Sequence, residues 1–292
     1  MSEHVVIDGE VVPSESASIS VRDRGFLYGD AAFETMRSYA GAIFAWEHHM
    51  DRLEATCALL DIDPPIDRET RLDWITRALA ANDLEEAAVR LSVTRGVQPG
   101  TIRPGGDGRP TVVILVRPLE RSGVAGHPAW DEPATVYTAT TRKVPDTAIP
   151  ARAKTHNYLN GILARLDVPD DADEALVRTV EGDVAEGTVS NLFLVEGDAL
   201  VTPAITSPIL PGVTREAVII LARLLEMDVR ETTVSPADLD DAEEAFLTNT
   251  TWEVRPIDAI DGRRLAVGSV TRRLADAFAT AVEANFYRRP AR

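Results

Sequence analysis

Lysine is scarce in this sequence, which makes its two lysines candidates for amine chemistry. Lys143 and Lys154 stand among 30 basic residues, and all the others are arginines. An arginine stays protonated, whereas a buried lysine can lose its proton, become nucleophilic and form a Schiff base with a carbonyl compound. We therefore take Lys154, in the segment ARAKTHNYLNGILARL, as the first candidate. The alternative is that a general bias toward arginine left two incidental lysines.

Several further residues have the chemistry that pyridoxal phosphate requires. Its aldehyde needs a lysine amine, its ring nitrogen needs an acid, and its phosphate needs N–H, hydroxyl and guanidinium donors. The residues that meet these needs are Lys154, Glu186, Gly212–Thr214, Thr250 and Arg52. Because the chain contains 47 acidic residues, the alternative for Glu186 is a role on the solvated surface.

The segment Leu210–Arg215, LPGVTR, indicates where a phosphate would bind. It leads directly into a predicted helix at Arg215–Glu226. A helix that begins after a Pro-Gly turn offers backbone N–H groups to an anion. We therefore expect the phosphate at the start of this helix.

The composition limits the class of protein that positions these residues. A chain of 292 residues, 45% of them hydrophobic, is long enough for two globular domains. The net charge of −17 argues against nucleic acid and anionic membranes as partners, because both would repel it. Acidic residues outnumber basic ones 47 to 30, which together with the scarce lysine indicates a salt-loving source organism.

Neither a secretion signal nor a membrane span is predicted. The N-terminus lacks a positively charged apolar segment, and no apolar run approaches ~18 residues. We expect a cytoplasmic protein. The single cysteine, Cys57, excludes an internal disulfide, cannot build a metal site alone, and is expected to pack in a helix.

In the first half of the chain, β-branched residues and turn signals alternate with helical periodicity. Asp8-Gly9 is a hairpin signal, and apolar residues at three- and four-residue spacing mark the helices. Strands are expected at His4–Val12, Ala17–Val21, Ala31–Tyr39, Ala42–Trp46, Ala88–Thr94 and Thr111–Val116, and helices at Glu47–Leu60 and Glu69–Ala81. The polar loop Arg95–Pro110 is expected to be either disordered or a lid over a site.

Dense turn chemistry at Pro118–Pro133 places a domain boundary there. We expect an N-terminal domain at 1–120, a linker at 121–132 and a C-terminal domain at 133–292. Strands in the second half are expected at Thr135–Val144, Glu174–Val180, Thr188–Val195, Leu200–Thr202 (a short edge strand), Val229–Thr233 and Glu244–Thr248. Helices are expected at Asn157–Leu166, Arg215–Glu226 and Val270–Phe286.

Six motifs, spread over nearly the whole chain, resemble those of the fold-type IV pyridoxal-phosphate enzymes. They are YGDAAFETMR, HHMDRLEAT, KTHNYLN, DEALVRTVEGDVAEGTVSNLF, ILPGVTR and FLTNTTWEVRPI. The family holds branched-chain aminotransferases, D-amino-acid aminotransferases, R-selective amine transaminases and 4-amino-4-deoxychorismate lyases. The resemblance implies a two-domain α/β protein with a smaller N-terminal α/β domain, a larger C-terminal pseudo-barrel domain, the cofactor between them and a homodimer.

The resemblance also implies roles for the cofactor residues. Lys154 would form the Schiff base and move the substrate proton, and Tyr158 would donate to the phenolic oxygen of the cofactor. Glu186 would pair with the pyridinium nitrogen, supported by Asn191. Leu210 would lie against the ring. The phosphate would be held by Gly212, Val213, Thr214, Thr250 and Arg52. The alternative for Tyr158 is packing at a helix start, while Lys143 has none of these partners at the expected spacings.

The substrate residues point to two branches of the family. Candidates for substrate binding are Tyr28, Phe33, Thr35, Arg90 and Thr251. Thr35 in FETMR matches the lyases, whereas KTHNYLN and ILPGVTR match the transaminases. Branched-chain enzymes place a tyrosine two residues before the arginine that corresponds to Arg90, and this chain has Ala88 there. Arg95 or Arg103 is a candidate for a substrate carboxylate, and the alternative is that both are solvated loop arginines.

We therefore predict a transaminase that moves an amino group between an amino acid or amine and a 2-oxo acid such as 2-oxoglutarate. The first alternative is the lyase that gives 4-aminobenzoate and pyruvate. An alternative of another class is an inactive homologue that binds a ligand or only dimerises. The joint presence of Lys154, Tyr158, Glu186 and the LPGVT segment favours an enzyme.

Overall fold

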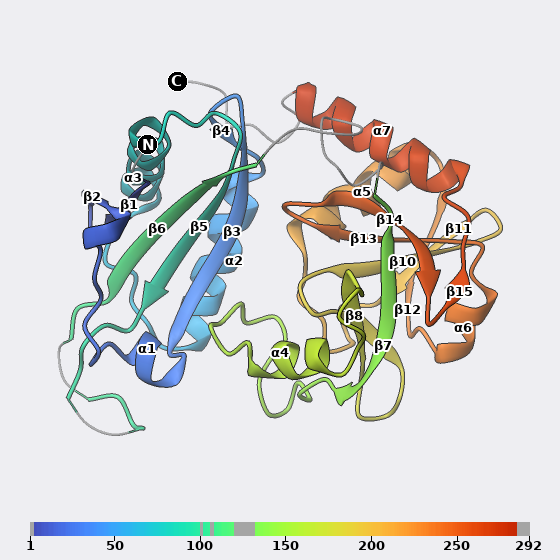
Figure 1. The fold of residues 1–292 in the computed structure, drawn as a ribbon, viewed down its shortest axis with the longest axis horizontal. Helices are drawn as coiled ribbons and strands as arrows, with labels where there is room; N and C mark the ends of the chain where they lie inside the picture. Colours follow the sequence, from blue (N-terminus) through green and yellow to red (C-terminus); the bar gives the residue numbers. More distant parts are fainter. Residues whose placement is uncertain (1–2, 100–101, 106–107, 120–131, 285–292) are drawn as a thin grey trace. The chain divides into compact units, whose positions relative to one another are not determined.

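The protein folds into two compact units, each with its own sheet, in a computed structural model that describes residues 3–99, 102–105, 108–119 and 132–284 (Figure 1). The first unit holds the described residues of Met1–Glu120 together with Ala153–Asn157. The second holds those of Arg121–Arg152 and Tyr158–Phe286. The predicted linker lies outside the described residues except for Glu132, so the predicted domain bounds stay a prediction.

An antiparallel six-stranded sheet in the order β2-β1-β6-β5-β3-β4 forms the first unit. Its strands are β1 (His4–Ile7), β2 (Glu10–Pro13), β3 (Ala31–Tyr39), β4 (Ala42–Ile43), β5 (Ala87–Thr94) and β6 (Thr111–Pro118). Helices α2 (Trp46–Leu59) and α3 (Arg68–Ala81) cover one face and bury residues such as Met36, Met50 and Ile75. A short helix, α1 (Arg24–Tyr28), precedes β3.

A nine-stranded mixed sheet forms the second unit, in the order β12-β11-β10-β13-β14-β7-β8-β9 with β15 beside β14. The strands are β7 (Ala134–Arg142), β8 (Glu174–Arg178), β9 (Val184–Gly187), β10 (Asn191–Glu196), β11 (Ala199–Pro203), β12 (Asp228–Thr232), β13 (Glu244–Asn249), β14 (Glu253–Ile260) and β15 (Arg263–Arg264). Because β9 also contacts β10 and β11, the sheet curls back on itself, as the pseudo-barrel expectation requires. Its helices are α4 (Leu159–Leu166), α5 (Val213–Leu224), α6 (Pro236–Asp241) and α7 (Ser269–Glu283).

Most expected elements of the first unit lie within a few residues of those observed, and two expectations are wrong. No strand forms at Ala17–Val21, because Ser20 accepts hydrogen bonds from Arg22 N–H and Asp23 N–H and turns the chain. The strand expected at Ala42–Trp46 ends at Ile43, since α2 begins at Trp46. The hairpin at Asp8-Gly9 is confirmed, with both residues at positive φ.

In the second unit, four details differ from expectation. The region expected to be a turn around EGDVAEG contains β9, because the turn is completed at Gly182 and Val184 already pairs with β8. Strand β11 has neighbours on both sides and is no edge strand. Strands β14 and β15 and helix α6 were not expected. Helix α5 begins at Val213, two residues before the expected start.

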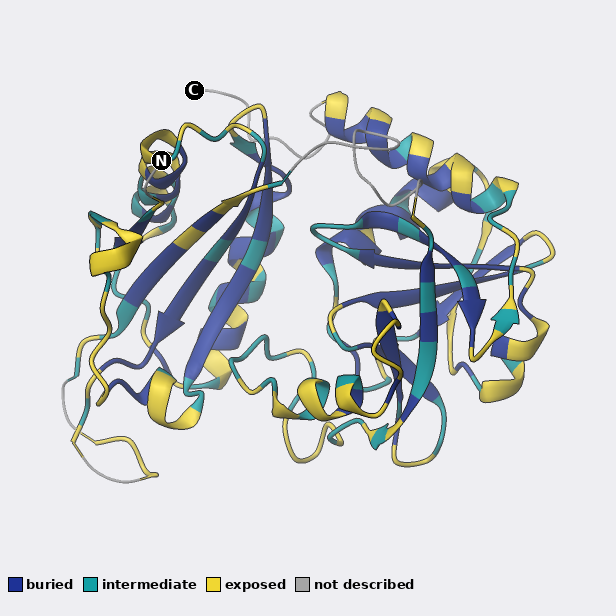
Figure 2. Ribbon diagram, in the orientation of Figure 1, coloured by how far each residue is buried: buried dark blue, intermediate teal, exposed yellow. Residues whose placement is uncertain are grey.

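Burial follows the expected amphipathic pattern, with dark blue buried residues along the central strands of both sheets (Figure 2). Cys57 is buried in α2, as expected. Among the described residues, none of the helices has the length and apolar character that crossing a membrane requires.

Candidate active site

Lys154 lies beside the start of β3 in the first unit. The backbone N–H of Phe33 donates to the Lys154 carbonyl (3.0 Å), and the N–H of His156 donates to the Ala31 carbonyl (3.2 Å). On its other side, the Lys154 N–H donates to Thr56 Oγ1 of α2 at 3.2 Å. The main chain of this lysine is therefore held by both a strand and a helix.

The amine of Lys154 shares a surface with three predicted substrate residues. Its Nζ lies 4.5 Å from the centre of the Phe33 ring, and the Arg90 guanidinium carbon lies 3.8 Å from the same ring. Phe33 and Thr35 project from the same face of β3, because side chains alternate along a strand. The register places Thr35 opposite Arg90. The structure thus brings Phe33, Thr35 and Arg90 together beside the catalytic candidate.

His156 belongs to the same surface, although its role was not predicted. Its ring lies 5.5 Å from that of Phe33, and its Nε2 lies 3.2 Å from Ser92 Oγ. Burial and the nearby Arg90 guanidinium lower the pKa of His156 to about 4, so the imidazole is neutral at neutral pH. Its position two residues after Lys154 was the signal, because alternate residues of an extended segment face the same side.

Tyr28 is the last residue of α1 and is partly exposed, with the Arg24 guanidinium over its ring. The next residue, Gly29, has positive φ, and its carbonyl accepts a hydrogen bond from Asn157 Nδ2 at 3.3 Å. The end of α1 therefore lies beside the KTHNYLN segment that holds Lys154.

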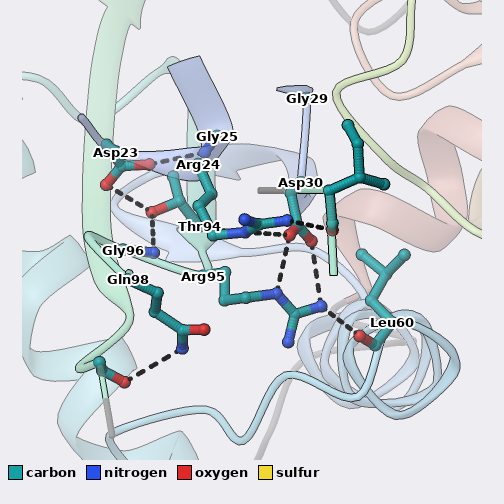
Figure 3. A network of polar contacts seen from close by, with 12 residues as sticks. Asp23, Arg24, Gly25, Gly29, Asp30, Leu60, Thr94, Arg95, Gly96 and Gln98 are labelled. Atoms are coloured by element: carbon teal, nitrogen blue, oxygen red, sulfur yellow. Dashed lines mark hydrogen bonds and ion pairs between the residues drawn. The ribbon is translucent and has the colours of Figure 1, made fainter. Parts of the chain in front are cut away.

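Arg95 does not match its predicted role as a carboxylate ligand for the substrate. Its guanidinium binds both carboxylate oxygens of Asp30, at 2.7 and 3.1 Å, and donates to the Leu60 carbonyl (Figure 3). It also donates to the Asp61 carbonyl. Arg24 shares the Asp30 carboxylate and reaches the Ile102 carbonyl. Arg95 is thus buried and not a solvated loop arginine, and its contacts hold the start of the loop against Asp30, Leu60 and Asp61.

Glu186 is buried in the second unit and held by three groups. Its Oε2 accepts from the Leu210 N–H at 2.9 Å and from Asn191 Nδ2 at 3.2 Å, and its Oε1 is ion-paired with Lys143. Asn191 also donates to the Leu210 carbonyl at 3.0 Å. Asn191 therefore lies in the supporting shell of Glu186, as expected. The contact with Lys143 was not expected, because sequence spacing offered no partner for this lysine.

The predicted phosphate residues of the second unit lie around the same asparagine. Val213 and Thr214 are the first two residues of helix α5, and the N-cap residue, Gly212, provides no side-chain cap. A Cβ atom on Gly212 would lie 2.0 Å from Asn191 Oδ1, so any side chain at this position would displace Asn191. Asn191 pairs with Thr248, two residues before Thr250. Glu186 and the uncapped helix start thus meet at the Asn191 side chain, and the Thr250 turn follows the strand that pairs with β10.

Asn249 organises the turn that carries Thr250 and Thr251, a role that the sequence did not reveal. Its Oδ1 accepts from the Thr251 N–H (3.0 Å), the Thr251 hydroxyl (3.1 Å) and the Trp252 N–H (2.7 Å). Asparagine commonly makes such side-chain turns. Tyr158, a further predicted cofactor residue of this unit, is the N-cap residue of α4.

The residues present fit pyridoxal phosphate. In the second unit, a buried carboxylate for the ring nitrogen lies next to a helix start whose backbone donors suit a phosphate. In the first unit, Lys154 supplies an amine and Arg52 a guanidinium that is largely buried. No cluster of His, Cys, Asp and Glu suited to a metal ion occurs among the described residues.

Comparison with known proteins identifies the family. The family model described as "Amino-transferase class IV" matches residues 31–260 of this chain. A "Putative branched-chain-amino-acid aminotransferase" of Methanocaldococcus jannaschii is 35% identical over 278 residues and 94% of each chain. An aminodeoxychorismate lyase of Bacillus subtilis is 30% identical, over 88% of this chain and 86% of its own, and a D-alanine aminotransferase of Listeria monocytogenes is 31% identical over 90% of each.

Solved structures agree. The branched-chain aminotransferase of Thermoproteus uzoniensis, solved with norvaline, superposes with a TM-score of 0.88 at 28% identity and covers 98% of this chain and 97% of its own. The branched-chain amino acid aminotransferase of Thermobaculum terrenum, solved in its PLP-bound holo form, gives a TM-score of 0.85 at 28% identity, over 96% of this chain and 94% of its own.

The fold and the two sets of site residues therefore define a fold-type IV pyridoxal-phosphate enzyme. The chain belongs to the class IV aminotransferases. It is a PLP-dependent aminotransferase of this family, in which branched-chain and D-alanine aminotransferases and an aminodeoxychorismate lyase are all relatives.

Proposed function

We propose that Lys154 is the amine that binds the cofactor aldehyde and that Glu186 is the acid opposite the ring nitrogen. The phosphate is held by Gly212, Val213 and Thr214 at the start of α5, with Thr250 and Arg52, and Tyr158 and Leu210 contact the ring and its phenolic oxygen. When bound, pyridoxal phosphate supplies an aldehyde and an electron sink.

The observation that carries this proposal is the environment of Glu186. Glu186 is only 6% exposed, and burying a carboxylate costs free energy unless the charge is paired. Glu186 accepts hydrogen bonds from a main-chain N–H and an amide N–H and is ion-paired with an ammonium group. The Leu210 N–H that holds it comes from the same segment that begins α5. One short segment thus fixes both the acid and the predicted phosphate donors.

For the substrate, we propose that Arg90 binds a carboxylate of the amino acid or 2-oxo acid. Its guanidinium lies on the Phe33 ring beside the Lys154 amine, so a carboxylate bound there places the rest of the substrate near that amine. Lys154 would take the proton from the substrate Cα through its Nζ amine. Tyr28, Thr35 and Thr251 complete the substrate pocket in this proposal. The acceptor is a 2-oxo acid such as 2-oxoglutarate.

A second candidate is the lyase reaction, which releases pyruvate from aminodeoxychorismate. Thr35 favours it, because this threonine matches the lyases and pairs with Arg90 in the register of β3 and β5. The relative from Bacillus subtilis also carries the lyase name. Measuring pyruvate release in the absence of any amino acceptor separates the two reactions: release supports the lyase, and its absence together with amino transfer supports the transaminase.

We also propose a homodimer, supported by the apolar stripe on α4 defined by Leu159, Ile162, Leu163 and Leu166. These side chains recur at helical spacing and are 46% to 76% exposed. An exposed apolar patch of this kind commonly marks an interaction site. Ile162→Glu should convert the dimer to a monomer in sedimentation analysis, whereas Leu224→Glu, which changes an exposed apolar residue of α5, should leave it dimeric. The cytoplasmic location and the halophilic source stay predictions.

A half-reaction screen tests the proposed transaminase and finds its donor. The holoenzyme is mixed with L-branched amino acids, L-glutamate, D-alanine, D-glutamate or an R-amine, and the visible absorbance of the cofactor is followed. A donor that bleaches the band without any acceptor is a substrate. Lys154→Ala should remove both the band and the turnover, and an unchanged spectrum would contradict the assignment of this lysine.

A further inference from the structure

We propose that Glu34 is a positioning residue that holds the Arg52 guanidinium in place for the cofactor phosphate. The inference rests on the proposed function, in which Arg52 contacts that phosphate. Glu34 lies in the FETMR motif, where only its neighbours Phe33 and Thr35 were candidates for the site.

Glu34 is fully buried and makes a two-point ion pair with Arg52. Arg52 Nε donates to Oε1 at 2.7 Å, and its Nη2 donates to Oε2 at 2.7 Å. His49 Nδ1 also contacts Oε2, at 2.8 Å. Although burial opposes ionisation, Arg52 and His49 outweigh it and lower the pKa of Glu34 to about 2. The carboxylate is therefore charged throughout the physiological range and fixes one edge of the guanidinium.

The strand alternation explains why Glu34 faces Arg52 and not the substrate. Phe33 and Thr35 project from one face of β3, and Glu34 projects from the other, against α2. On α2, His49, Arg52 and Thr56 follow one another at helical spacing on the buried side. Thr56 holds the main chain of Lys154. One helix face thus holds the main chain of Lys154 through Thr56 and also carries Arg52, the proposed phosphate ligand.

The burial of the pair points to positioning as its role. Two charges removed from water gain little stability over apolar packing, so a buried ion pair is weak evidence for a purely structural function. Glu34 is 0% exposed and Arg52 11%, so the arginine alone reaches beyond the buried layer. A two-point pair is geometrically specific, which fits a guanidinium that must face a phosphate in a single orientation.

The test measures how the full-length apoprotein binds pyridoxal phosphate and pyridoxal, which lacks the phosphate. Glu34→Gln should weaken pyridoxal phosphate binding about 10- to 100-fold, the effect of losing a charge-assisted hydrogen bond, and should leave pyridoxal binding unchanged. Arg52→Gln should show the same selectivity. The double variant should bind pyridoxal phosphate as weakly as Arg52→Gln alone, because Glu34 acts through Arg52.

The outcomes distinguish this inference from the proposed function. If Arg52→Gln itself binds pyridoxal phosphate normally, the phosphate assignment of Arg52 fails. If Arg52→Gln weakens binding and Glu34→Gln does not, or if Glu34→Gln weakens pyridoxal equally, the positioning role is overturned. Glu54→Gln is the matched control. Glu54 lies elsewhere on α2 and pairs with Arg68 and Arg71 of α3, so this variant should leave both affinities unchanged. Should Glu34→Gln fail to fold, Glu34→Asp takes its place under the same criteria.

Discussion

The ammonium group of Lys143 is ion-paired with the carboxylate of Glu186, the acid assigned to the cofactor ring nitrogen. In the proposed function, both lysines of the chain therefore belong to the site. The main chain of Lys154 is held by β3 and α2 in the first unit, whereas Lys143 supports an acid in the second. Sequence spacing alone linked only Lys154 to the cofactor.

Replacing Lys143 should slow turnover without releasing the cofactor. In Lys143→Met, Glu186 keeps the Leu210 N–H and Asn191 but loses a charged partner, and a charge-assisted hydrogen bond is worth about 1.5–3 kcal/mol. We expect kcat to fall about 10-fold while the visible absorbance of the bound cofactor persists. A variant that has lost the band would show that Lys143 is needed for cofactor binding itself.

Replacing Arg90 should weaken the binding of carboxylate substrates. Arg90→Gln removes the cation on the Phe33 ring, and KM for the 2-oxo acid should rise about 10- to 100-fold, the effect of one charged hydrogen bond. Arg103→Gln is the matched control, because this arginine is exposed on the loop. If KM for the 2-oxo acid rose only in Arg103→Gln, the substrate carboxylate would bind at the loop and not at Arg90.

Arg95 should matter for stability and not for substrate binding. Arg95→Met leaves Asp30 with only Arg24 and deprives the Leu60 and Asp61 carbonyls of a donor, which should cost about 2–4 kcal/mol of unfolding free energy. Urea unfolding measures the loss, and Arg103→Met should change it by less than about 0.5 kcal/mol. A stable Arg95→Met protein with a raised KM would restore the predicted role of Arg95 in substrate binding.

The low pKa of His156 predicts that the protein loses stability in mild acid. The pKa falls from 6.5 to about 4 on folding, so between these values the unfolded chain binds a proton that the folded chain does not. The free energy of unfolding is therefore unaffected by the protonation of His156 above pH 6.5. As the pH falls from 6.5 toward 4, protonation of this residue in the unfolded chain lowers that free energy by up to about 3 kcal/mol. His156→Gln should show a smaller loss in urea unfolding over this window, and parallel curves for the two proteins would contradict the shift.

Much of the fold was predictable because periodicity and turn chemistry are local. The strand Ala31–Tyr39 is observed at those bounds, and the helix expected at Glu47–Leu60 is α2, shifted by one residue. The strand predicted at Ala17–Val21 is absent, because its alternation of side chains is also compatible with an exposed turn. The hydrogen bonds of Ser20 stabilise that turn.

The supporting residues of the site were harder to predict, since their partners are distant in sequence. Lys143 and Glu186 are separated by 43 positions, and nothing in their spacing signals a contact. Glu34 did leave a signal: a charged residue between Ala32 and Met36, on the inward face of a buried strand, requires a partner. The HHMDR motif contained both of its partners, His49 and Arg52.

The most direct test of the account is to find which lysine carries the cofactor. The holoenzyme is reduced with borohydride, which fixes the bond between cofactor and lysine, and its peptides are mapped by mass spectrometry. We expect a phosphopyridoxyl group on Lys154, its loss in Lys154→Ala and its persistence in Lys143→Met. A label on Lys143, or on neither lysine, would contradict the assignment of Lys154.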